Sequence, residues 1–406
     1  MSTIGWEPKA LGKCVKFLSG GTPSKSRSDF WDGDIPWVSS GEMTQRRIIE
    51  TKLHINEQGA LEGSRIVPSN TVLAVVRGMS LAKEFRVSIT QREMAFNQDI
   101  KAFTCDPNVE SEFLFYALLA RQEHIRDLAT EASHGTKKLE TDVLARFPIL
   151  VPRLEVQRRV IAVILAYDDL IENNRRRMVL LEDAARQLYR EWFVRLRFPG
   201  HEHTRIVDGV PEGWEWKKIG EIAECIGGGT PSTTVSTYWE DGGVTWVTPT
   251  DVTKNKHFVL LDSAKKITEA GLISSSAKLV PPYAILMTSR ASVGYFAIAG
   301  KEVCTNQGFI SIVVGEPTLS PYLLFHLSER VEEIRAMGSG STFPEVSRGK
   351  FREFQVLVPR HALSVSFYEQ TTKLLRQIRV LKQQNESLQA ARDLLLPHLM
   401  SGEIAV

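Results

Sequence analysis

Three polar residues past the middle of the chain have the order of a metal-dependent nuclease site. Asp208 is followed by Glu215 and, two residues later, by Lys217. In such sites carboxylates hold Mg²⁺ and a lysine stabilises the attacked phosphate. The pattern is short, and the matching segment near the N-terminus, Glu7-x-Lys9, has no acidic residue upstream. We therefore favour a structural strand here and keep a metal-dependent DNA nuclease as the alternative.

Other motifs that could do chemistry are incomplete. Pro281-Pro282-Tyr283 is similar to a motif of adenine-N6 methyltransferases, but Val280 stands where those enzymes have an Asn or Asp that accepts a hydrogen bond from the amine, so a turn is predicted. His201-Glu202-His203 is better explained as a polar linker, because adjacent ligands suit a tetrahedral metal site poorly. Two Gly-Gly-Thr-Pro-Ser segments lack the Gly-Lys-Ser/Thr ending of a phosphate-binding loop. We therefore predict no catalytic residue and no metal site in this sequence.

The two Gly-Gly-Thr-Pro-Ser segments, 20–24 and 228–232, belong to an internal repeat. Their offset of 208 residues (228 − 20) also separates Trp6 from Trp214, and Asn97 and Asn306 stand 209 residues apart. A near-constant offset over this distance indicates duplication of one folding unit. Each copy combines short β-branched and aromatic runs, broken by Gly, Pro, Ser and Asn, with a long helical segment at its end. A shorter helix is predicted near residues 111–129 of the first copy.

Each copy offers loop side chains of the types that contact DNA. Arg recognises guanine and Asn or Gln recognises adenine, whereas small polar groups, glycine amides and lysines contact phosphates. The candidates in the first copy are Ser39, Ser40, Arg77, Lys83, Arg86, Asn97, Gln98, Gly135, Thr136, Lys137 and Lys138. Those in the second copy are Thr248, Thr250, Lys254, Arg290, Asn306, Gln307, Gly340, Ser341 and Thr342. The same residue types form turns, and turn capping is an open alternative for Asn97 and Asn306.

The long helical segments carry heptad seams, which predict that the two helices pair. In the first copy the seam positions are Val156, Val160, Val163, Tyr167, Leu170, Asn174, Met178, Leu181, Ala185, Leu188 and Trp192. In the second copy they are Leu363, Phe367, Thr371, Leu374, Ile378, Leu381, Asn385, Leu388, Ala391 and Leu395. We expect an antiparallel pair that acts as a spacer of about 54 Å, at about 1.5 Å per residue. Asn174 and Asn385 would fix its register if buried, while a position at the wet edge of the seam stays open.

Composition is typical of an ordinary globular protein of two or three domains. The 406 residues include 50 Lys and Arg against 48 Asp and Glu, a net charge of +2, so any basic surface must be local. Hydrophobic residues make up 43% and charged residues 24% of the chain, which excludes a wholly disordered protein. The four cysteines lie far apart, and neither a secretory signal nor a membrane span is recognisable. We therefore expect a reduced, cytoplasmic location.

In combination, these motifs resemble the specificity subunit of type I restriction-modification systems. The likeness rests on the Gly-Gly-Thr-Pro-Ser segment with the Asp-Ile-Pro-Trp-Val-Ser-Ser run after it, and on the Asn-Gln pair. It rests also on Gly-Thr-Lys-Lys-Leu before Phe-Pro-Ile-Leu-Val-Pro, and on the helix start Leu-Glu-Val-Gln-Arg-Arg-Val. The likeness extends over nearly the whole chain, to residues 394–403. The second helix departs from it by starting Arg360-His361-Ala362-Leu363-Ser364, which weakens the case for equivalent partner docking at both helices.

The resemblance implies an α+β fold in which two pseudo-repeated mixed α/β target recognition domains are separated by two long helices that form an antiparallel coiled coil. It implies a non-catalytic chain that binds a bipartite site on double-stranded DNA and directs adenine methylation and cleavage by other subunits. The implied partners are two modification (methyltransferase) subunits, which use S-adenosylmethionine, and restriction (translocase and endonuclease) subunits, which use ATP and Mg²⁺. No cofactor is expected in this chain. A repeat-containing coiled-coil scaffold that binds protein or sugar is a further alternative.

The repeat also predicts where the domains begin and end. We expect a first recognition domain at 1–152, a first spacer helix at 153–198, a linker at 199–211, a second recognition domain at 212–359, and a second spacer helix with a C-terminal tail at 360–406.

Overall fold

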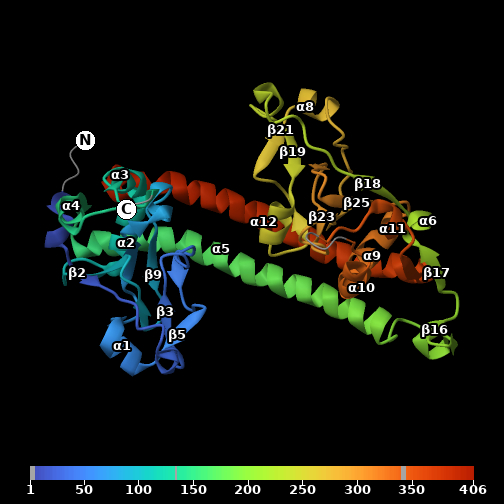
Figure 1. Ribbon diagram of the computed structural model, residues 1–406, viewed down its shortest axis with the longest axis horizontal. Coiled ribbons are helices and arrows are strands. Elements are labelled where there is room, and N and C mark those ends of the chain that lie inside the picture. Colours follow the sequence, from blue (N-terminus) through green and yellow to red (C-terminus); the bar gives the residue numbers. More distant parts are fainter. Residues whose placement is uncertain (1–4, 133–134, 340–343) are drawn as a thin grey trace. The chain divides into compact units, whose positions relative to one another are not determined.

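The computed structural model describes residues 5–132, 135–339 and 344–406, and its chain divides into two compact units. Unit 1 comprises Met1–Leu170 and Ser387–Val406, and unit 2 comprises Ile171–Glu386. In Figure 1 the strands of unit 1 run from blue to teal and those of unit 2 from yellow-green to orange. Each unit contains one mixed α/β part and a segment of each of the two long helices, α5 (Leu154–Tyr189) and α12 (His361–Ser401). In the described part of the chain, no helix is both long and apolar enough to cross a membrane.

Unit 1 is built from short strands and short helices that precede α5. Its strands are β1 (Glu7–Ala10), β2 (Val15–Ser19), β3 (Ile35–Val38), β4 (Arg47–Ile48), β5 (Leu53–Ile55), β6 (Ile66–Val67), β7 (Val72–Val75), β8 (Arg77–Gly78), β9 (Val87–Thr90), β10 (Met94–Phe96), β11 (Ile100–Cys105), β12 (Thr130–Glu131), β13 (Lys137–Lys138) and β14 (Pro148–Val151). Its short helices are η1 (Leu11–Lys13), η2 (Ser28–Trp31), α1 (Glu57–Gly63), η3 (Met79–Ala82), α2 (Ser111–Ala120), α3 (Gln122–Asp127) and α4 (Thr141–Arg146).

Unit 2 repeats this pattern between α5 and α12. Its strands are β15 (Ile206–Val207), β16 (Val210–Pro211), β17 (Glu215–Lys218), β18 (Ala223–Gly227), β19 (Val244–Val247), β20 (Val259–Leu260), β21 (Lys265–Ile267), β22 (Ile285–Thr288), β23 (Phe296–Ala299), β24 (Cys304–Thr305), β25 (Phe309–Val314) and β26 (Gln355–Val358). Its short helices are η5 (Arg190–Val194), η6 (His201–His203), α6 (Ile219–Ile222), η7 (Ser236–Tyr238), α7 (Pro249–Lys254), α8 (Glu269–Ile273), η8 (Pro317–Leu319), α9 (Ser320–Glu329), α10 (Val331–Ala336) and α11 (Arg348–Arg352).

The sheets of the two units have the same topology. The large sheet has the order β2-β11-β7-β9-β4 in unit 1 and β18-β25-β22-β23-β20 in unit 2. A smaller sheet contains β5-β3-β10-β6 in unit 1 and β21-β19-β24 in unit 2. The same four strands pair in parallel, β4 with β9 and β3 with β10 in unit 1, and β20 with β23 and β19 with β24 in unit 2. The duplication predicted from the sequence is therefore a duplication of one mixed α/β fold.

The central strands of the large sheets are buried on both faces. In β7, Val72 and Ala74 belong to the apolar cluster that contains α2, while Leu73 and Val75 belong to a second cluster that contains Val38 of the smaller sheet. Alternate side chains of a strand point to opposite faces, so the large sheet lies between a helical layer and the smaller sheet. In β22 of unit 2, Ile285 and Leu286 are divided between two clusters in the same way.

The long helices run antiparallel in each unit. In unit 1, Asp168 of α5 pairs with Arg392 of α12, and Ile161 of α5 shares a core with Leu399 of α12. In unit 2, Asn174 contacts Asn385, and the ring of Phe193, just after α5, lies 4.9 Å from that of Phe367. Residue numbers rise along one helix as they fall along the other, which confirms the predicted antiparallel coiled coil. α5 and η5 together end at Val194 and α12 begins at His361, close to the expected limits of the helices; the domain boundaries themselves stay a prediction.

Most predicted seam positions are buried in unit 2, and several positions in both units are shifted by one residue; in unit 2, Leu374 is only partly buried whereas Leu375 is 2% exposed. The buried members of the predicted seam in unit 2 are Asn174, Met178, Ala185, Leu363, Phe367, Thr371, Ile378, Leu381 and Asn385. Leu170 is 47% exposed, so its placement in the seam was wrong, and Ile171 is buried in its place. On α12 of unit 1, Leu396 is buried whereas Leu395 is only partly so. An α-helix has 3.6 residues per turn and drifts against a repeat of 3.5, so a seam extrapolated by strict heptads moves off the contact face.

Candidate nucleic-acid interface

The Gly-Gly-Thr-Pro-Ser loop of unit 1 follows β2 and lies directly against the end of β10. A Cβ on Gly20 would stand 2.2 Å from the carbonyl oxygen of Phe96, a distance that no side chain tolerates. The amide of Gly21 donates to that same carbonyl at 2.9 Å, and its own carbonyl accepts a hydrogen bond from Trp37 Nε1 at 3.0 Å. The two glycines therefore serve close backbone packing.

The loop of unit 2 follows β18 and has the same contacts. A Cβ on Gly228 would stand 2.0 Å from the carbonyl oxygen of Asn306. The amide of Gly229 donates to the carbonyl of Thr305 at 2.8 Å, and its carbonyl accepts from Trp246 Nε1 at 2.8 Å. The motif thus has a repeated structural function, namely to hold the loop against the turn that follows β10 or β24.

Each loop holds the glutamine of the Asn-Gln pair. In unit 1, Thr22 donates its hydroxyl hydrogen to Gln98 Oε1 at 2.6 Å, and in unit 2 Thr230 donates to Gln307 Oε1 at 2.5 Å. Both glutamines are exposed, and within residues 5–132, 135–339 and 344–406 neither Nε2 group has a hydrogen-bond partner. Both amide groups are thus oriented with free donors toward solvent.

The preceding asparagines cap the turn, which was the open structural alternative. Asn97 is 6% exposed, and its Oδ1 accepts from the amide of Asp99 at 3.1 Å. Asn306 Oδ1 accepts from the amide of Gly308 at 2.9 Å. Both side chains shape the backbone at Gln98 and Gln307, so the glutamines are the more accessible members of each pair. A DNA contact by either asparagine stays a prediction.

The hydroxyl candidates after the third strand also have structural partners. Ser39 donates to Glu42 Oε2 at 3.0 Å, and Thr248 donates to Asp251 Oδ2 at 2.6 Å and caps α7. The neighbouring candidates, whose side chains form no hydrogen bond in the described parts of the chain, are Ser40, Thr250 and Lys254.

Three basic candidates of unit 1 come together on a small sheet of order β12-β13-β8. Arg77 lies directly opposite Lys138, and Lys137 lies opposite Gly78. Residues opposite one another in an antiparallel pair project from the same face, so Arg77 and Lys138 share a face and Lys137 points from the other. Lys138 Nζ pairs with Glu140 at 2.6 Å, whereas Arg77 is exposed and has no ion pair within the described residues. Chain segments about sixty residues apart thereby form one basic edge.

A partly buried acid, Asp99, lies near this edge. Asp99 has its pKa raised by burial, and the positive charge of Arg77 opposes that rise. Gly135 adopts a left-handed conformation at φ +71°, and the carbonyl of Thr136 accepts from the amide of Ala132 at 2.8 Å. The remaining candidates of unit 1 are Lys83, which is exposed, and Arg86, whose Nε lies 3.3 Å from Glu84 Oε2.

Arg290 of unit 2 occupies the position of Arg77. It follows β22 as Arg77 follows β7, and it forms a bridge to Glu345, which in turn bridges to Ser339. Arg290 Nε lies 3.7 Å from Glu345 Oε2, and both side chains are exposed. The candidates Gly340, Ser341 and Thr342 lie outside the described residues, as does His134 of unit 1.

The two seam asparagines are in contact. Asn174 Nδ2 donates to Asn385 Oδ1 at 2.9 Å, and Asn385 Nδ2 donates to the carbonyl of Ile171 at 3.2 Å. Their exposed fractions are 2% and 6%, so neither lies at a wet edge of the seam. That the pair selects the register stays a prediction.

Several polar contacts that join the helices to the α/β parts were missed. In unit 1, Tyr116 donates to Asp168 at 2.5 Å, and Asp168 also pairs with Arg392. Burial and Asp168 together raise the pKa of Tyr116 above its ordinary value. The signal in the sequence was an aspartate in the middle of a predicted helix, which periodicity alone assigns to solvent.

In unit 2 the corresponding contacts go to the backbone. Glu182 Oε2 accepts from the amide of Phe258 at 2.8 Å, and Lys382 Nζ donates to the carbonyl of Val259 at 2.8 Å. Burial lowers the pKa of Lys382, while backbone and side-chain hydrogen bonds lower that of Glu182 against the opposing effect of burial. Thr22 and Thr230 were missed as well, although the repeat itself pointed to them.

The segment that suggested a nuclease is a structural strand. Glu215 and Lys217 lie on β17, which pairs with β26 as β1 pairs with β14 in unit 1. Lys217 Nζ lies 3.0 Å from Glu215 Oε2, and in unit 1 Lys9 Nζ lies 3.5 Å from Glu7 Oε2. Asp208 belongs instead to the turn of the β15–β16 hairpin, at φ +50°. The same ion pair in both units has a structural explanation, so the nuclease alternative is not supported.

The other incomplete motifs have ordinary structures. Tyr283 lies at φ +69° in a turn closed by the hydrogen bond from the amide of Ala284 to the carbonyl of Pro281, at 3.2 Å. His201 is part of the short helix η6, and its Nδ1 lies 2.8 Å from the carbonyl of Phe198. Within the described residues, no group of three or more His, Cys, Asp or Glu side chains could hold a metal ion.

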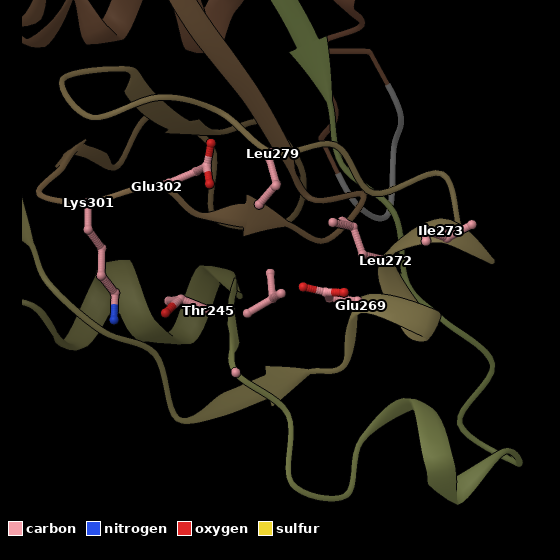
Figure 2. Close-up of a pocket in the computed structure, with 9 residues that line it drawn as sticks. Thr245, Glu269, Leu272, Ile273, Leu279, Lys301 and Glu302 are labelled. Atoms are coloured by element: carbon pink, nitrogen blue, oxygen red, sulfur yellow. The ribbon is translucent and has the colours of Figure 1, made fainter.

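A pocket of about 450 Å³ lies in unit 2 between α8, β19 and the segment after β23. Figure 2 shows Glu269 of α8 and Leu279 extending toward its middle, with Lys301 and Glu302 at one side and Ile273 at the opposite edge. None of the predicted DNA-contact residues lines it. The pocket is therefore separate from the candidate interface.

Comparison with known proteins agrees with this geometry. The family model described as type I restriction modification DNA specificity domain matches residues 3–182 and 211–390. The chain is 25% identical over 419 residues to the type I restriction enzyme MjaIX specificity subunit of Methanocaldococcus jannaschii, covering 99% of this chain and 94% of that protein. It is 22% identical over 474 residues to the HindI specificity subunit of Haemophilus influenzae, covering 98% and 99%.

The fold is similar to that of a solved structure. The crystal structure of the type I restriction-modification S subunit from M. genitalium aligns with a TM-score of 0.59 at 16% identity, covering 97% of this chain and 96% of that one. Each matched range of the family model contains one mixed α/β part and most of the helix that follows it. The chain therefore belongs to the type I restriction-modification DNA specificity family, as a non-catalytic specificity subunit with two recognition domains.

Proposed function

We propose that the chain reads a bipartite site on double-stranded DNA, one half-site with each unit. The observation that carries this proposal is the matched, exposed position of Arg77 and Arg290, each directly after the central strand of a large sheet and beside a glycine-containing segment. Arginine is the side chain that most often reads guanine in the major groove, and nearby glycine amides and small polar groups bind phosphates.

The other candidates have different tasks in this proposal. Lys137 and Lys138 contact phosphates and release counterions, which makes unit 1 the more salt-dependent reader. Arg77 and Arg290 read base edges. The candidates proposed for further contacts to bases or phosphates are Ser39, Ser40, Lys83, Arg86, Asn97, Gln98, Gly135, Thr136, Thr248, Thr250, Lys254, Asn306, Gln307, Gly340, Ser341 and Thr342.

The partners of the chain in this proposal are two modification subunits and the restriction subunits of a type I system. The family membership and the names of the relatives support this. Modification subunits would use S-adenosylmethionine to methylate adenine, and restriction subunits would use ATP and Mg²⁺ to translocate and cleave DNA. The chain itself would need no cofactor, and the complex would act in the cytoplasm.

The helix pair would set the gap between the half-sites. The buried hydrogen bond between Asn174 and Asn385 would fix its register, since a buried asparagine tolerates only a polar partner. Lengthening both helices by one turn next to this pair is expected to widen the gap and leave both half-sites unchanged.

A footprint of the chain in complex with its modification subunits tests the proposal. We expect two protected blocks separated by an unprotected gap, and methylated adenine in both blocks when S-adenosylmethionine is added. One continuous protected block, or nicking of DNA by the isolated chain with Mg²⁺ that Glu215→Ala abolishes, would contradict it.

A further inference from the structure

The contact between the Gly-Gly-Thr-Pro-Ser loop and the Asn-Gln turn is the same in both units, atom for atom. It joins residues 76 positions apart in unit 1 and 77 apart in unit 2. In each unit the threonine hydroxyl donates a hydrogen bond to the side-chain oxygen of the glutamine. A tryptophan Nε1 donates to the loop backbone, and the asparagine before the glutamine caps the turn. The core of neither unit needs an exposed glutamine at this position.

A feature kept identical in two readers must serve what their two half-sites share. The units differ elsewhere along the candidate interface: Lys138 lies opposite Arg77 in unit 1, whereas Glu345 lies opposite Arg290 in unit 2. Arg290 pairs with Glu345, while Arg77 has no ion pair within the described residues. Base choice depends on such differences. The sugar-phosphate backbone is the part of the duplex that is the same at every half-site.

The chemistry of the glutamine side chain points the same way. Recognition of adenine by glutamine uses both the carbonyl oxygen and the amide hydrogens at once. Here the oxygen already accepts a hydrogen bond from the threonine, while the amide donors have no partner in the described parts of the chain. A fixed donor of this kind suits a single acceptor such as a phosphate oxygen.

We propose that Thr22 and Thr230 are positioning residues that orient Gln98 and Gln307, so that each glutamine Nε2 donates to a DNA phosphate oxygen at its half-site. The inference rests on the proposed function. It adds that this contact contributes affinity at both half-sites and no sequence preference.

Equilibrium binding of the complex with its modification subunits tests the inference. The probes are the target duplex, duplexes with single base-pair changes in either half-site, and an unrelated duplex, each at several salt concentrations. Gln98→Ala is expected to weaken binding about tenfold on every duplex, the loss of one hydrogen bond to a charged group. The ratio between target and changed duplexes and the dependence on salt should stay as in the wild type, because a neutral amide releases no counterion.

Three further variants and one control separate positioning from folding. Thr22→Val should weaken binding about threefold, since an unpinned glutamine pays more to become ordered, and Thr22→Ser should restore it. Gln98→Glu keeps the acceptor for Thr22 but places a negative charge at the phosphate, so its loss should exceed that of Gln98→Ala. Gln91→Ala, which removes an exposed glutamine on the turn after β9, is the matched control and should bind like the wild type.

Each outcome separates the inference from the proposed function. If Gln98→Ala changed the preference at one base pair, or left binding unchanged, the inference would be wrong although sequence-specific binding stood. If the wild-type complex failed to distinguish the target from the unrelated duplex, the proposed function would fail instead. Each phosphate of the unit 1 half-site can be replaced in turn by an uncharged methylphosphonate. At one phosphate this replacement should reduce the affinity of the wild type more than it reduces the affinity of the Gln98→Ala variant. If the two proteins lost the same affinity at every phosphate, the inference would be overturned.

Discussion

The two long helices differ in the hydrogen bonds that a buried side chain makes near the start of each helix. On α5, Gln157 is fully buried, accepts from the amide of Glu110 at 2.9 Å, and donates to the carbonyls of Asn108 and Pro152 at 2.9 and 2.8 Å. At the matching position of α12, Ser364 is 2% exposed, and its hydroxyl has no hydrogen-bond partner among the residues that the structure describes. The departure from the family pattern at the start of α12 therefore removes a connection between the helix and the α/β part of unit 2.

Unit 2 makes up for this with aromatic packing. Phe193 lies 4.6 Å from Tyr322 and 4.9 Å from Phe367, and Tyr189 stacks on Phe325 at 5.9 Å. Edge-on and offset aromatic pairs stabilise a core beyond the area they bury. In unit 1 the helices instead contribute aliphatic side chains such as Ile164 and Leu399 to the core, and polar contacts such as those of Gln157 add to them. The duplication has thus kept topology and loop contacts while the buried polar contacts diverged, and each unit can be destabilised separately.

Asp168→Ala should have the largest effect, and it should be confined to unit 1. Arg392 is 8% exposed, and its guanidinium would keep only the exposed Asp393 as a partner, while the hydroxyl of Tyr116 would lose its acceptor. Removing one member of a buried ion pair costs about 4 kcal/mol. Hydrogen exchange of unit 1 peptides measures this loss. Tyr116→Phe, which removes the hydrogen bond to Asp168 and the long one from Arg47 Nη2 at 3.4 Å, is the control and should cost about 1.5 kcal/mol. Equal protection of unit 1 in Asp168→Ala and wild type would contradict the prediction.

Gln157→Ala and Ser364→Ala compare the helix starts directly. The first change removes the partner of the part-buried Glu110 amide and Asn108 carbonyl and of the buried Pro152 carbonyl, and should lower the free energy of unfolding of unit 1 by about 3 kcal/mol. The second removes a hydroxyl for which the described part of the chain offers no partner, and should change the stability of unit 2 by less than about 0.5 kcal/mol. Hydrogen exchange at the ends of β14 and β26 measures the stability change in unit 1 and unit 2, respectively. If both variants lost a similar free energy of unfolding, the different hydrogen bonding of Gln157 and Ser364 would not affect stability.

The sequence predicted the duplication, the mixed sheets and both long helices, because these depend on local periodicity and on motifs repeated at a constant offset. It placed Asn174 and Asn385 correctly in the seam for the same reason. It placed Leu170 wrongly, because a heptad pattern does not reveal where a straight helix drifts off its partner. Periodicity therefore predicts well where a helix lies in the sequence. It predicts which face of the helix packs on its partner only over a few turns.

The candidate site was less predictable, because its geometry depends on contacts between distant segments. Arg77 meets Lys138 through a sheet of two-residue strands, which carry no recognisable pattern. The hydrogen bond from Thr22 to Gln98 joins residues 76 positions apart, with strands β3 to β10 and helix α1 between them. The sequence signal for it was that both residues recur in the second copy, as Thr230 and Gln307. Polar residues that recur in both copies, and that a hydrophobic core does not require, indicate a shared contact.

Acid should destabilise unit 2 more than unit 1. Burial, with the charge of Arg330, lowers the pKa of His326 from 6.5 to about 3, and the matching residue of unit 1 is Ala117. Arg330 Nη1 lies 3.3 Å from His326 Nε2, so Nε2 is the acceptor and Nδ1 carries the hydrogen toward Tyr189. Below pH 6.5 the unfolded chain binds a proton that the folded unit does not accept, so stability falls as the pH drops toward 3.

The expected loss for unit 2 between pH 7 and pH 5 is about 2 kcal/mol. Hydrogen exchange at both pH values, corrected for the intrinsic rates, measures it in each unit. His326→Gln retains a donor and an acceptor but does not titrate, so it should remove the excess pH dependence of unit 2. If that variant kept the wild-type slope, another group would be responsible.

The smallest expected effects concern the matched arginines of the two units, Arg77 and Arg290, and their contributions to base discrimination. Arg77→Ala should weaken discrimination within one half-site by about 1.5 kcal/mol and leave the other half-site unchanged, and Arg290→Ala should do the converse. The loss should be smaller for Arg290, because its exposed ion pair with Glu345 must open before it can contact a base, whereas Arg77 has no ion pair in the described residues. Glu345→Gln should therefore tighten binding at the half-site of unit 2. Binding to duplexes with every single base-pair change measures all three, and an effect of Arg77→Ala on both half-sites would mean that the two units do not read DNA independently.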